Sequence, residues 1–407
     1  METAKTPVRP LAGLKVLELG QLIAGPFAGK VLAEFGAEVI KIEPPASGKD
    51  PGGDPLRQWR LLHDGTSLWW YVQARNKKSV TANLRMAEGQ AIARRLSRDA
   101  DIVIENFRPG TLEKWGLGYD VLAADNPGLI LLRLSGFGQT GPYRDQPGFG
   151  AVGESMGGMR HVTGFPERPP VRMNISIGDA LAALHGVIGV LMALHHRNAH
   201  GGKGQVVDVA LYEAVFNMME SLIPDYDLHG DIRGRIGTGL TNIVPSNTYT
   251  TRDGQSVVIA GNGDSIYKRL MHAIDRDDLG QDPELASNVG RVKRTTAIDG
   301  AIGEWAAAHD LENILRVLKA ADVPHGKIYT AADIVNDPQY LARDMIRQVK
   351  LADGTPLKLP GIVPKLSDTP GDMDWVGPAL GEHTEEVLRA AGYDSDAIAR
   401  LRAVGAI

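Results

Sequence analysis

The chain has no cysteine, no excess of positive charge and no long uninterrupted apolar segment. Without cysteine it can form no disulfide, use no thiolate nucleophile and build no cysteine-based zinc site. The most apolar stretch, 180–194, has about 15 residues with His185 among them, which favours a buried helix over a membrane span. Residues 1–7 contain no apolar core of a secretory signal, so we expect a cytoplasmic protein.

Lys and Arg number 44 against 49 Asp and Glu, which gives a formal net charge of −5. This balance argues against a nucleic acid or an anionic membrane as partner. The 407 residues exceed the usual size of one domain, and a hydrophobic content of 43% is ordinary for a soluble globular protein. We therefore expect a soluble protein with at least two domains.

Strand and helix patterns alternate through the first half of the chain. The expected strands are 14–19, 38–43, 102–104, 129–134 and 206–209, and the expected helices are 27–35, 87–98, 179–197 and 211–222. Such alternation predicts an α/β fold with a parallel sheet covered by helices on both faces. From about 225 the sequence becomes polar and Gly-rich, then shows a hairpin-like pair around 251–254 and amphipathic helices, so we expect a smaller domain at 225–330.

Three glycine motifs suggest other functions. Segments 136–141 and 148–153 match the dinucleotide pattern G-x-G-x-x-G, but the first runs into Pro142 and the second follows a loop, which disfavours NAD or FAD. Segment 153–157 matches the G-x-S-x-G elbow around Ser155, although no clear strand precedes it, so a serine hydrolase remains an alternative. The helix that carries His185, His195 and His196 has no carboxylate three or four residues away, and we expect no metal site.

Gly178-Asp179 stands at the entrance of the long apolar helix, after the β-favouring run 171–177. A carboxylate there is stabilised as the anion by free N–H groups and by the helix dipole. Asp is also a preferred capping residue, so both a helix cap and a nucleophile remain open on local pattern. Gly178 allows a backbone or a ligand to approach the carboxylate closely.

Two basic clusters, 75–79 and 106–110 with Lys114, are expected in loops close to sheet edges, where open α/β folds bind ligands. Solvated surface charge is the alternative interpretation of each cluster. Together with the Gly-rich turns, the two clusters suit an elongated ligand that carries phosphates.

With these motifs in place the chain resembles the class III CoA-transferases, which include formyl-CoA transferase, carnitine CoA-transferase and the α-methylacyl-CoA racemases. The likeness follows the family's order over nearly the whole chain, at 14–18 with 25–26, 36–43, 76–79, 105–110, 135–138, 178–179, 202–208 and 380–384. It implies an interlocked homodimer with a Rossmann-like large domain, built from 1–224 and 331–407, and a small inserted α+β domain. Coenzyme A (CoA) and acyl-CoA are implied as substrates, without a tightly bound cofactor.

By the same resemblance Asp179 is the catalytic residue, and CoA contacts Ile23, Ala24, Thr81, Ala82, Asn83, Leu84, Asn106, Phe107, Arg108, Lys114, Gly148, Phe149 and Gly150. Pro44 stands where the family has a basic residue, so we expect Arg75 or Lys77 to supply that phosphate contact. Phe149 stands where the racemases carry the histidine that partners the aspartate. Because Phe cannot move a proton, a racemase is the weaker alternative.

The run from 159 to 179 looks most like the family branch that moves CoA between succinate and other dicarboxylic acids. The resemblance implies that Asp179 forms an aspartyl-CoA thioester, a form of covalent catalysis by a carboxylate. We expect Arg160, Arg168 or Arg172 to hold the distal carboxylate of the acid. Gly237–Gly239 and Gly261–Gly263 are candidate closing loops by composition.

Overall fold

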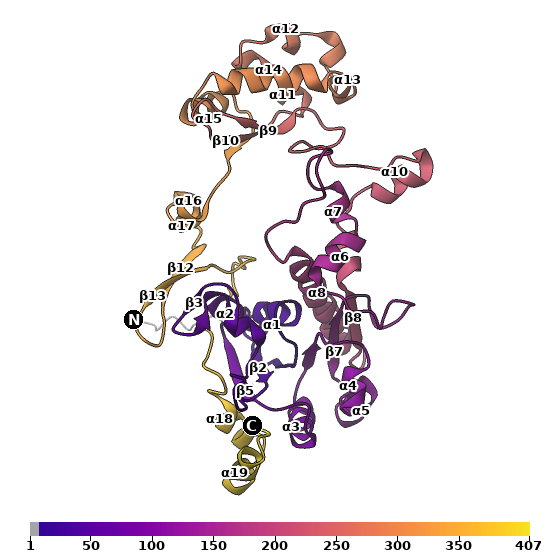
Figure 1. Ribbon diagram of the computed structural model, residues 1–407, viewed down its shortest axis with the longest axis vertical. Helices are drawn as coiled ribbons and strands as arrows, with labels where there is room; N and C mark the ends of the chain where they lie inside the picture. Colours follow the sequence, from indigo (N-terminus) through magenta and orange to yellow (C-terminus); the bar gives the residue numbers. More distant parts are fainter. Residues whose placement is uncertain (1–7) are drawn as a thin grey trace. The chain divides into compact units, whose positions relative to one another are not determined.

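A computed structural model describes residues 8–407 (Figure 1). The stretch 1–7, on which the expectation about a secretory signal rests, lies outside the described residues. Contacts divide the chain into two units. Unit 1 comprises the chain up to 159 together with 173–220 and 344–407, and unit 2 comprises 160–172 and 221–343.

Unit 1 contains a six-stranded sheet with helices between its strands. The strands of this sheet are β1 (Lys15–Glu18), β2 (Glu38–Glu43), β5 (Lys77–Thr81), β6 (Ile102–Glu105), β7 (Ile130–Ser135) and β8 (Val206–Ala210). The main helices are α1 (Ala24–Glu34), α2 (Leu68–Gln73), α3 (Ala87–Ser97), α4 (Thr111–Lys114), α5 (Tyr119–Asp125), α6 (Gly150–Met156), α8 (Ile177–Ala199), α9 (Leu211–Phe216), α18 (Thr384–Ala390) and α19 (Ser395–Ala403). Smaller elements are the helix η1 (Pro55–Gln58), the pair β3 (Leu62–His63) and β4 (Thr66–Ser67), and the hairpin β12 (Ile346–Lys350) and β13 (Pro356–Pro360).

The strands of the six-stranded sheet are all parallel and follow the order β5-β2-β1-β6-β7-β8. The predicted α/β fold with a parallel sheet is therefore confirmed. The five expected strands are all present. β5 was not expected, because Lys77, Lys78 and Ser79 looked like a basic loop.

The alternation of side chains along each strand builds a core on both faces of this sheet. Val16, Ile104 and Leu132 point to the face covered by α1 and α8. Leu17 and Val103 point to the other face, where α3 and the C-terminal helices α18 and α19 pack. Residues from both ends of the chain thus share one core.

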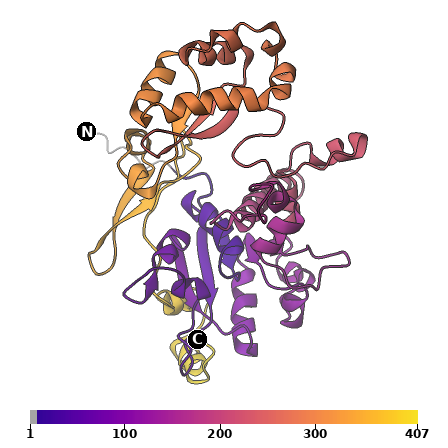
Figure 2. The same cartoon turned by 45° about the horizontal axis from the view of Figure 1, so that its top comes forward.

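Unit 2 has its own sheet and core. The antiparallel strands β9 (Ser246–Thr250), β10 (Ser256–Ala260) and β11 (His325–Lys327) pair in the order β11-β10-β9, and the turn between β9 and β10 is the expected hairpin. Figure 2 shows the orange helix α14 (Thr295–Ala307) lying along these strands, where its buried face joins the unit 2 core. The other helices are α7 (Met159–Val162), α10 (Leu222–His229), α11 (Asp264–Ala273), α12 (Asp277–Gly280), η2 (Pro283–Leu285), α13 (Asn288–Lys293), α15 (Leu311–Ala320), α16 (Ala331–Ile334) and α17 (Pro338–Ala342).

The contact boundaries differ from the small domain expected at 225–330, because unit 2 also takes in 160–172. The Arg235 guanidinium donates to the carbonyl oxygens of His161 and Phe165, at 3.3 and 3.2 Å. The Gly237 N–H donates to the Gly164 carbonyl at 2.9 Å. These bonds join 161–165 to 235–237 although about 70 residues separate them in the chain.

One local expectation was wrong. The helix expected at 211–222 ends at Phe216, and a separate helix, α10, begins at Leu222. The β-favouring run 171–177 forms no strand, since its residues before α8 are irregular and mostly exposed.

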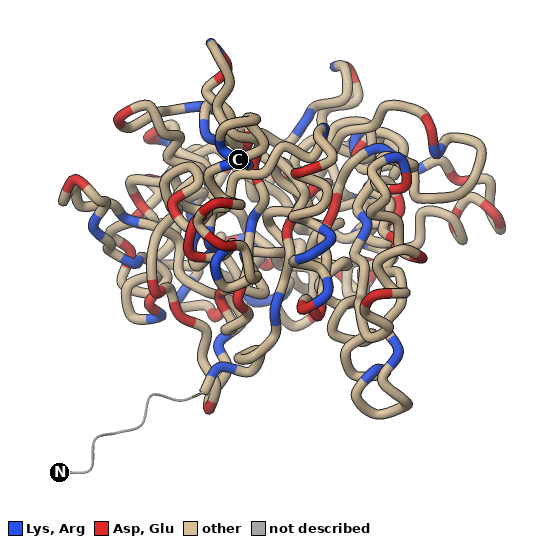
Figure 3. The backbone as a smooth tube through the Cα atoms, turned by 90° about the horizontal axis from the view of Figure 1, so that it is seen from below, with Lys and Arg blue, Asp and Glu red and all other residues tan. Residues whose placement is uncertain are grey.

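Helix α8 is long and apolar enough to cross a membrane by length and composition alone. A core helix passes the same test, and Ala182, Val190 and Ala193 of α8 are buried in the unit 1 core. Figure 3 shows Lys and Arg interspersed with Asp and Glu along the described chain.

Candidate active site

The predicted CoA-contacting residues stand where the parallel strands of unit 1 end. Thr81 is the last residue of β5 and 82–84 follow it, while 106–108 come directly after β6. Ile23 and Ala24 lie at the start of α1, in the connection that leaves β1. The carboxyl ends of parallel strands meet at one edge of a sheet, the edge where open α/β folds bind ligands. The structure therefore brings these predicted residues together.

Asp179 lies half-buried in the first turn of α8, and its carboxylate rests on the backbone of Gly150. A Cβ built on Gly150 would stand 2.1 Å from Oδ2 of Asp179. A Cβ on Gly178 would lie 3.0 Å from the carbonyl oxygen of Gly150. Gly148 touches the loop after β7 in the same way, since a Cβ there would lie 2.8 Å from the Cα of Gly136. The predicted nucleophile and the segment 148–150 thus share one site.

The loops that follow β1 and β6 are joined by Asn106. Its Oδ1 accepts a hydrogen bond from the N–H of Gln21, and its Nδ2 donates to the carbonyl of Gln21, both at 2.8 Å. Gly20 makes room for this pairing, because a Cβ there would lie 2.7 Å from Oδ1 of Asn106. The side chain of Asn106, expected to contact CoA, therefore holds the loop that leads to Ile23 and Ala24.

A buried cluster of charged side chains also holds the loop after β1 in place. The Asp54 carboxylate accepts hydrogen bonds from the N–H of Leu22 at 3.0 and 3.1 Å and pairs with Nζ of Lys41 at 2.8 Å. Lys41 also binds Glu18 at 3.0 Å and the Gly20 carbonyl at 2.8 Å. Burial opposes the charge on Asp54, but the Lys41 ammonium outweighs it and keeps the pKa of this carboxyl below its ordinary value. Leu22 is held at φ 64°, in the left-handed region that an apolar residue rarely adopts.

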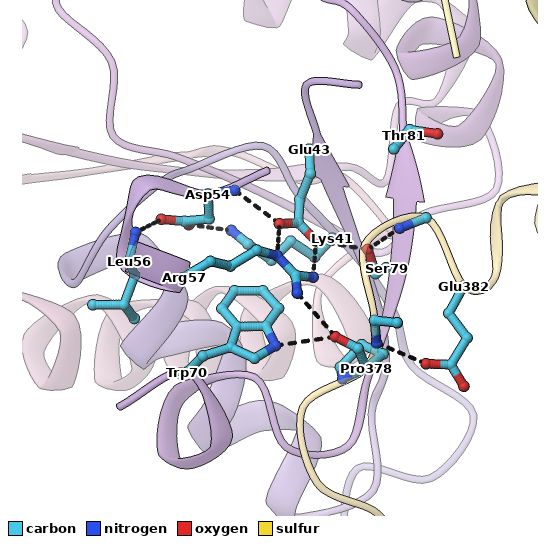
Figure 4. Close-up of polar contacts among 12 residues, drawn as sticks. Lys41, Glu43, Asp54, Leu56, Arg57, Trp70, Ser79, Thr81, Pro378 and Glu382 are labelled. Atoms are coloured by element: carbon cyan, nitrogen blue, oxygen red, sulfur yellow. Dashed lines mark hydrogen bonds and ion pairs between the residues drawn. The ribbon is translucent and has the colours of Figure 1, made fainter. Parts of the chain in front are cut away.

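A second buried network ties the C-terminal segment to the sheet (Figure 4). The Arg57 guanidinium binds the Glu43 carboxylate through two contacts of 2.8 Å and donates to the Pro378 carbonyl at 3.1 Å. Trp70 donates to the same carbonyl at 3.0 Å, and Ser79 donates to Glu43 at 2.6 Å. Burial opposes ionisation of Glu43, yet Arg57 prevails and the pKa of Glu43 lies below its ordinary value. Residues near 380 thereby become part of unit 1.

Two residues expected to bind a phosphate are buried and already paired. Arg75 is 2% exposed, forms an ion pair with Glu34 and donates to the Pro360 carbonyl at 2.6 Å. Lys77 lies under α1, with Nζ 2.7 Å from Glu18 and 2.7 Å from the Pro26 carbonyl, and burial lowers its pKa to about 8. Both side chains therefore stabilise the fold, which corrects the expectation that either replaces the contact missing at Pro44.

Three other cations remain open at the ligand edge. Arg85, Arg108 and Lys114 are exposed, and among residues 8–407 none of the three pairs with a carboxylate. Arg85 was not among the residues predicted to contact CoA, although it directly follows 81–84. Phe107 packs edge-on against Trp115, with 5.1 Å between ring centroids, and so anchors the segment that carries Arg108.

Arg133 fixes the helix that carries Lys114. It binds Glu105 at the end of β6 and Glu113 in α4, both at 2.6 Å. Burial raises the pKa of Glu105 to about 7, although the Arg133 guanidinium opposes this shift. Glu105 also accepts a hydrogen bond from the N–H of Phe107 at 2.7 Å, so one buried carboxyl orients the turn after β6.

The alternative motifs lack the geometry that their chemistry needs. Ser155 lies inside α6 with helical residues before it, and its Oγ donates to the Ala151 carbonyl at 3.0 Å, so no strand-to-helix elbow is formed. His185 is bonded to the Leu181 carbonyl at 2.8 Å and to Asn217 at 3.0 Å. A dinucleotide motif must follow a strand and open a helix; segment 136–141 follows β7 but opens no helix.

The structure thus places Asp179 in the first turn of α8, and Arg85, Arg108 and Lys114 exposed in segments that follow the strand ends. The sequence profile of CoA-transferase family III matches residues 11–384. The chain belongs to this family and is a CoA-transferase.

Its relatives act on small dicarboxylic acids. The chain is 49% identical over 403 residues to the succinyl-CoA–D-citramalate CoA-transferase of Chloroflexus aurantiacus, covering 98% of this chain and 99% of that one. It is 40% identical to the alpha subunit of succinyl-CoA–L-malate CoA-transferase from the same organism, over 97% and 91% of the two chains. The succinyl-CoA:mesaconate CoA-transferase of Haloarcula marismortui is 34% identical, over 95% and 97%.

Solved structures agree with this assignment. A CaiB/BaiF family protein from Brucella suis superposes with a TM-score of 0.81 at 34% identity, covering 94% of this chain and 99% of that one. The Rv3272 protein of Mycobacterium tuberculosis gives a TM-score of 0.80 at 28% identity, with 93% and 99% covered.

Proposed function

We propose that this enzyme transfers CoA from succinyl-CoA to a dicarboxylic acid through a covalent intermediate on Asp179. The position of the Asp179 carboxylate carries the proposal, since it lies in the first turn of α8 and against Gly150. A helix start favours the ionised form that a nucleophile needs. The printed activities of the relatives with citramalate, malate and mesaconate support the choice of substrates.

The reaction exchanges one thioester for another and needs no external energy source. The Asp179 carboxylate attacks the thioester carbonyl, which gives a mixed anhydride and releases CoA thiolate. The thiolate then attacks the aspartyl carbonyl, which forms the aspartyl-CoA thioester and releases succinate. The acceptor carboxylate attacks this thioester to form a second mixed anhydride, and CoA thiolate attacks its acceptor carbonyl, which yields the new acyl-CoA and free Asp179.

The ligand edge of unit 1 supports CoA binding. Ile23 and Ala24, the turn 81–84, the segment 106–108 and the glycine segment 148–150 surround the ends of the strands, and Lys114 follows in α4. Open cations are suitable partners for the phosphates of CoA, because Arg offers several donors to a phosphate and Lys a mobile positive charge. We infer that Arg85 joins Arg108 and Lys114 in this role.

Proton transfer at the α-carbon has little support in the site. A racemase needs one group to remove the proton and another to return it from the opposite face. Phe149 caps α6 beside Gly150 and its side chain is 70% exposed. Neither Phe149 nor Gly150 can titrate, so the segment beside Asp179 contributes no second base.

We also propose a cytoplasmic homodimer with a Rossmann-like large domain. The sheet order supports the latter, since numbering only these strands along the chain gives 3-2-1-4-5-6. Exposed apolar residues on α8, namely Leu184, Ile188, Leu191 and Met192, recur at helical spacing and support burial by a second copy. One of Arg160, Arg168 and Arg172 is proposed to bind the distal carboxylate of the acid.

The experiment that tests this function is an acceptor screen. Purified enzyme is mixed with succinyl-CoA and each of a panel of mono- and dicarboxylic acids, and product CoA esters are identified by mass spectrometry. Asp179→Asn should abolish transfer while CoA still binds, and Ser155→Ala should keep most of the activity. Transfer that survives in Asp179→Asn, or thioester hydrolysis that depends on Ser155, would refute the proposal.

A further inference from the structure

Gly150 touches Asp179 more closely than any side chain could. A Cβ on Gly150 would stand 2.1 Å from Oδ2, 2.8 Å from Cγ and 3.4 Å from Oδ1 of Asp179. Real Cβ atoms essentially never approach another heavy atom closer than 3.0 Å. The φ angle of Gly150 lies outside the left-handed region, so its backbone conformation is open to other residues. A side chain at 150 therefore requires the Asp179 carboxylate to shift, while the backbone conformation itself would accept other residues.

The contact between the starts of α6 and α8, here called the seam, also has a glycine on the α8 side. Gly178 precedes Asp179, and a Cβ there would lie 3.0 Å from the carbonyl oxygen of Gly150 and 3.4 Å from Cγ of Glu154. Both Gly150 and Gly178 are buried, as is Glu154. The start of α6 thus packs backbone to backbone on the start of α8, and the position of Asp179 depends on this close approach.

We propose that Gly150 is a positioning residue that sets the place of the Asp179 carboxylate, beyond the CoA contact that resemblance assigns to it. The inference rests on the proposed function, because it takes Asp179 as the nucleophile. A methyl group at 150 forces the carboxylate to retreat from 2.1 Å to at least 3.0 Å from that carbon, a shift of about 0.9 Å. A misplacement of about 1 Å can cost roughly 100-fold in rate.

Gly150→Ala is the direct test, with two glycine variants beside it. In Gly178→Ala the added Cβ would lie 3.0 Å from its nearest neighbour instead of 2.1 Å, so the loss of kcat should be smaller than in Gly150→Ala. Gly300→Ala is the matched control, since it lies within α14 and a Cβ there would meet no atom within 4 Å. Each variant is measured for kcat, for the Kd of CoA by calorimetry and for its unfolding midpoint.

Covalent labelling separates a displaced nucleophile from a damaged binding site. Enzyme and succinyl-CoA are treated with hydroxylamine, which converts an activated Asp179 to its hydroxamate, and the peptide is quantified by mass spectrometry. Gly150→Ala should lose about 100-fold in kcat and in labelling rate at saturating succinyl-CoA, a loss larger than any change in the Kd of CoA. The loss should fall in the order Gly150→Ala, Gly178→Ala, Gly300→Ala.

Near-normal labelling and kcat in Gly150→Ala would overturn the inference. A Kd for CoA that rises in parallel with the fall in kcat would also overturn it, because Gly150 would then act through CoA binding. If Gly150→Ala fails to fold, Gly178→Ala serves as the test. A labelling rate equal to wild type in Gly178→Ala would then contradict the inference that this glycine contact positions Asp179. Absence of labelling in the wild-type enzyme would instead refute the proposed function itself.

Discussion

Replacing Asn106 by Ala should weaken CoA binding without changing the chemistry at Asp179. The amide of Asn106 makes two hydrogen bonds of 2.8 Å to the backbone of Gln21, and it is the only described side chain that pairs with that residue. The bonds hold the loop after β1 in place at the ligand edge. Asp179 lies on a different element, α8, and keeps its contact with Gly150 in this variant.

The magnitude follows from the two bonds. A half-buried hydrogen bond contributes about 1 kcal/mol, so the ordered conformation of the loop loses roughly 2 kcal/mol of stabilisation. If CoA binding must restore this order, the Kd of CoA rises by about 30-fold, because each 1.4 kcal/mol is a factor of ten. The value of kcat at saturating substrate should stay within about twofold of wild type, since no group at the reacting carbonyl has moved.

Asn126→Ala is the matched control for this change. The Asn126 amide donates to the carbonyls of Ser97 and Ala100 at 3.1 and 2.7 Å, before the strands β6 and β7 begin. The control should lose similar stability yet bind CoA as the wild-type enzyme does. Calorimetric titration with CoA measures both variants. Equal Kd values for Asn106→Ala and the wild-type enzyme would refute the proposal that Asn106 orders the loop after β1 for CoA binding.

Three further outcomes are expected. Arg75→Met leaves the buried Glu34 carboxylate without its main partner, so it should lower the free energy of unfolding by about 3–5 kcal/mol in denaturant titrations. The folded variant should keep its affinity for CoA. Unchanged stability with weakened CoA binding would instead indicate that Arg75 contacts a phosphate. Glu43→Gln should flatten the acid limb of stability, because a depressed folded pKa contributes stability above about pH 4 that is lost as pH falls through the folded value; unfolding curves between pH 3 and 7 that match wild type in slope would contradict this. Arg108→Gln should raise the Kd of CoA and reduce its salt dependence, and a salt dependence equal to wild type in calorimetry would argue against a phosphate contact.

Local pattern was sufficient for most of the parallel sheet. The apolar runs of β1, β6 and β7 mark buried strands, a further apolar run marks β8, and the alternation at 38–43 marks β2. β5 escaped because its first residues are Lys77 and Lys78. The charge of Lys77 is buried only by pairing with Glu18, which lies 59 residues earlier in the chain. A partner at that distance leaves no trace in a local pattern.

The candidate site was predictable in its parts but not in its contacts. Strand ends indicated the edge of the sheet where a ligand is expected, while local pattern left a cap and a nucleophile open at Asp179, and only the family resemblance assigned it the catalytic role. The contact of Gly150 with the Asp179 carboxylate depends on how α6 packs on α8, and α6 itself has a glycine-rich sequence that predicts a loop. Arg75 was assigned wrongly for the same reason, since its partner Glu34 lies on another element.

We propose that Asp179 becomes covalently linked to CoA during transfer. The most direct measurement is mass spectrometry of the Asp179 peptide after the enzyme is mixed with succinyl-CoA and quenched with hydroxylamine. We expect a hydroxamate on Asp179 that appears only with an acyl-CoA present and that decreases when an acceptor acid is added. An unmodified Asp179 peptide, in enzyme that turns over, would contradict it.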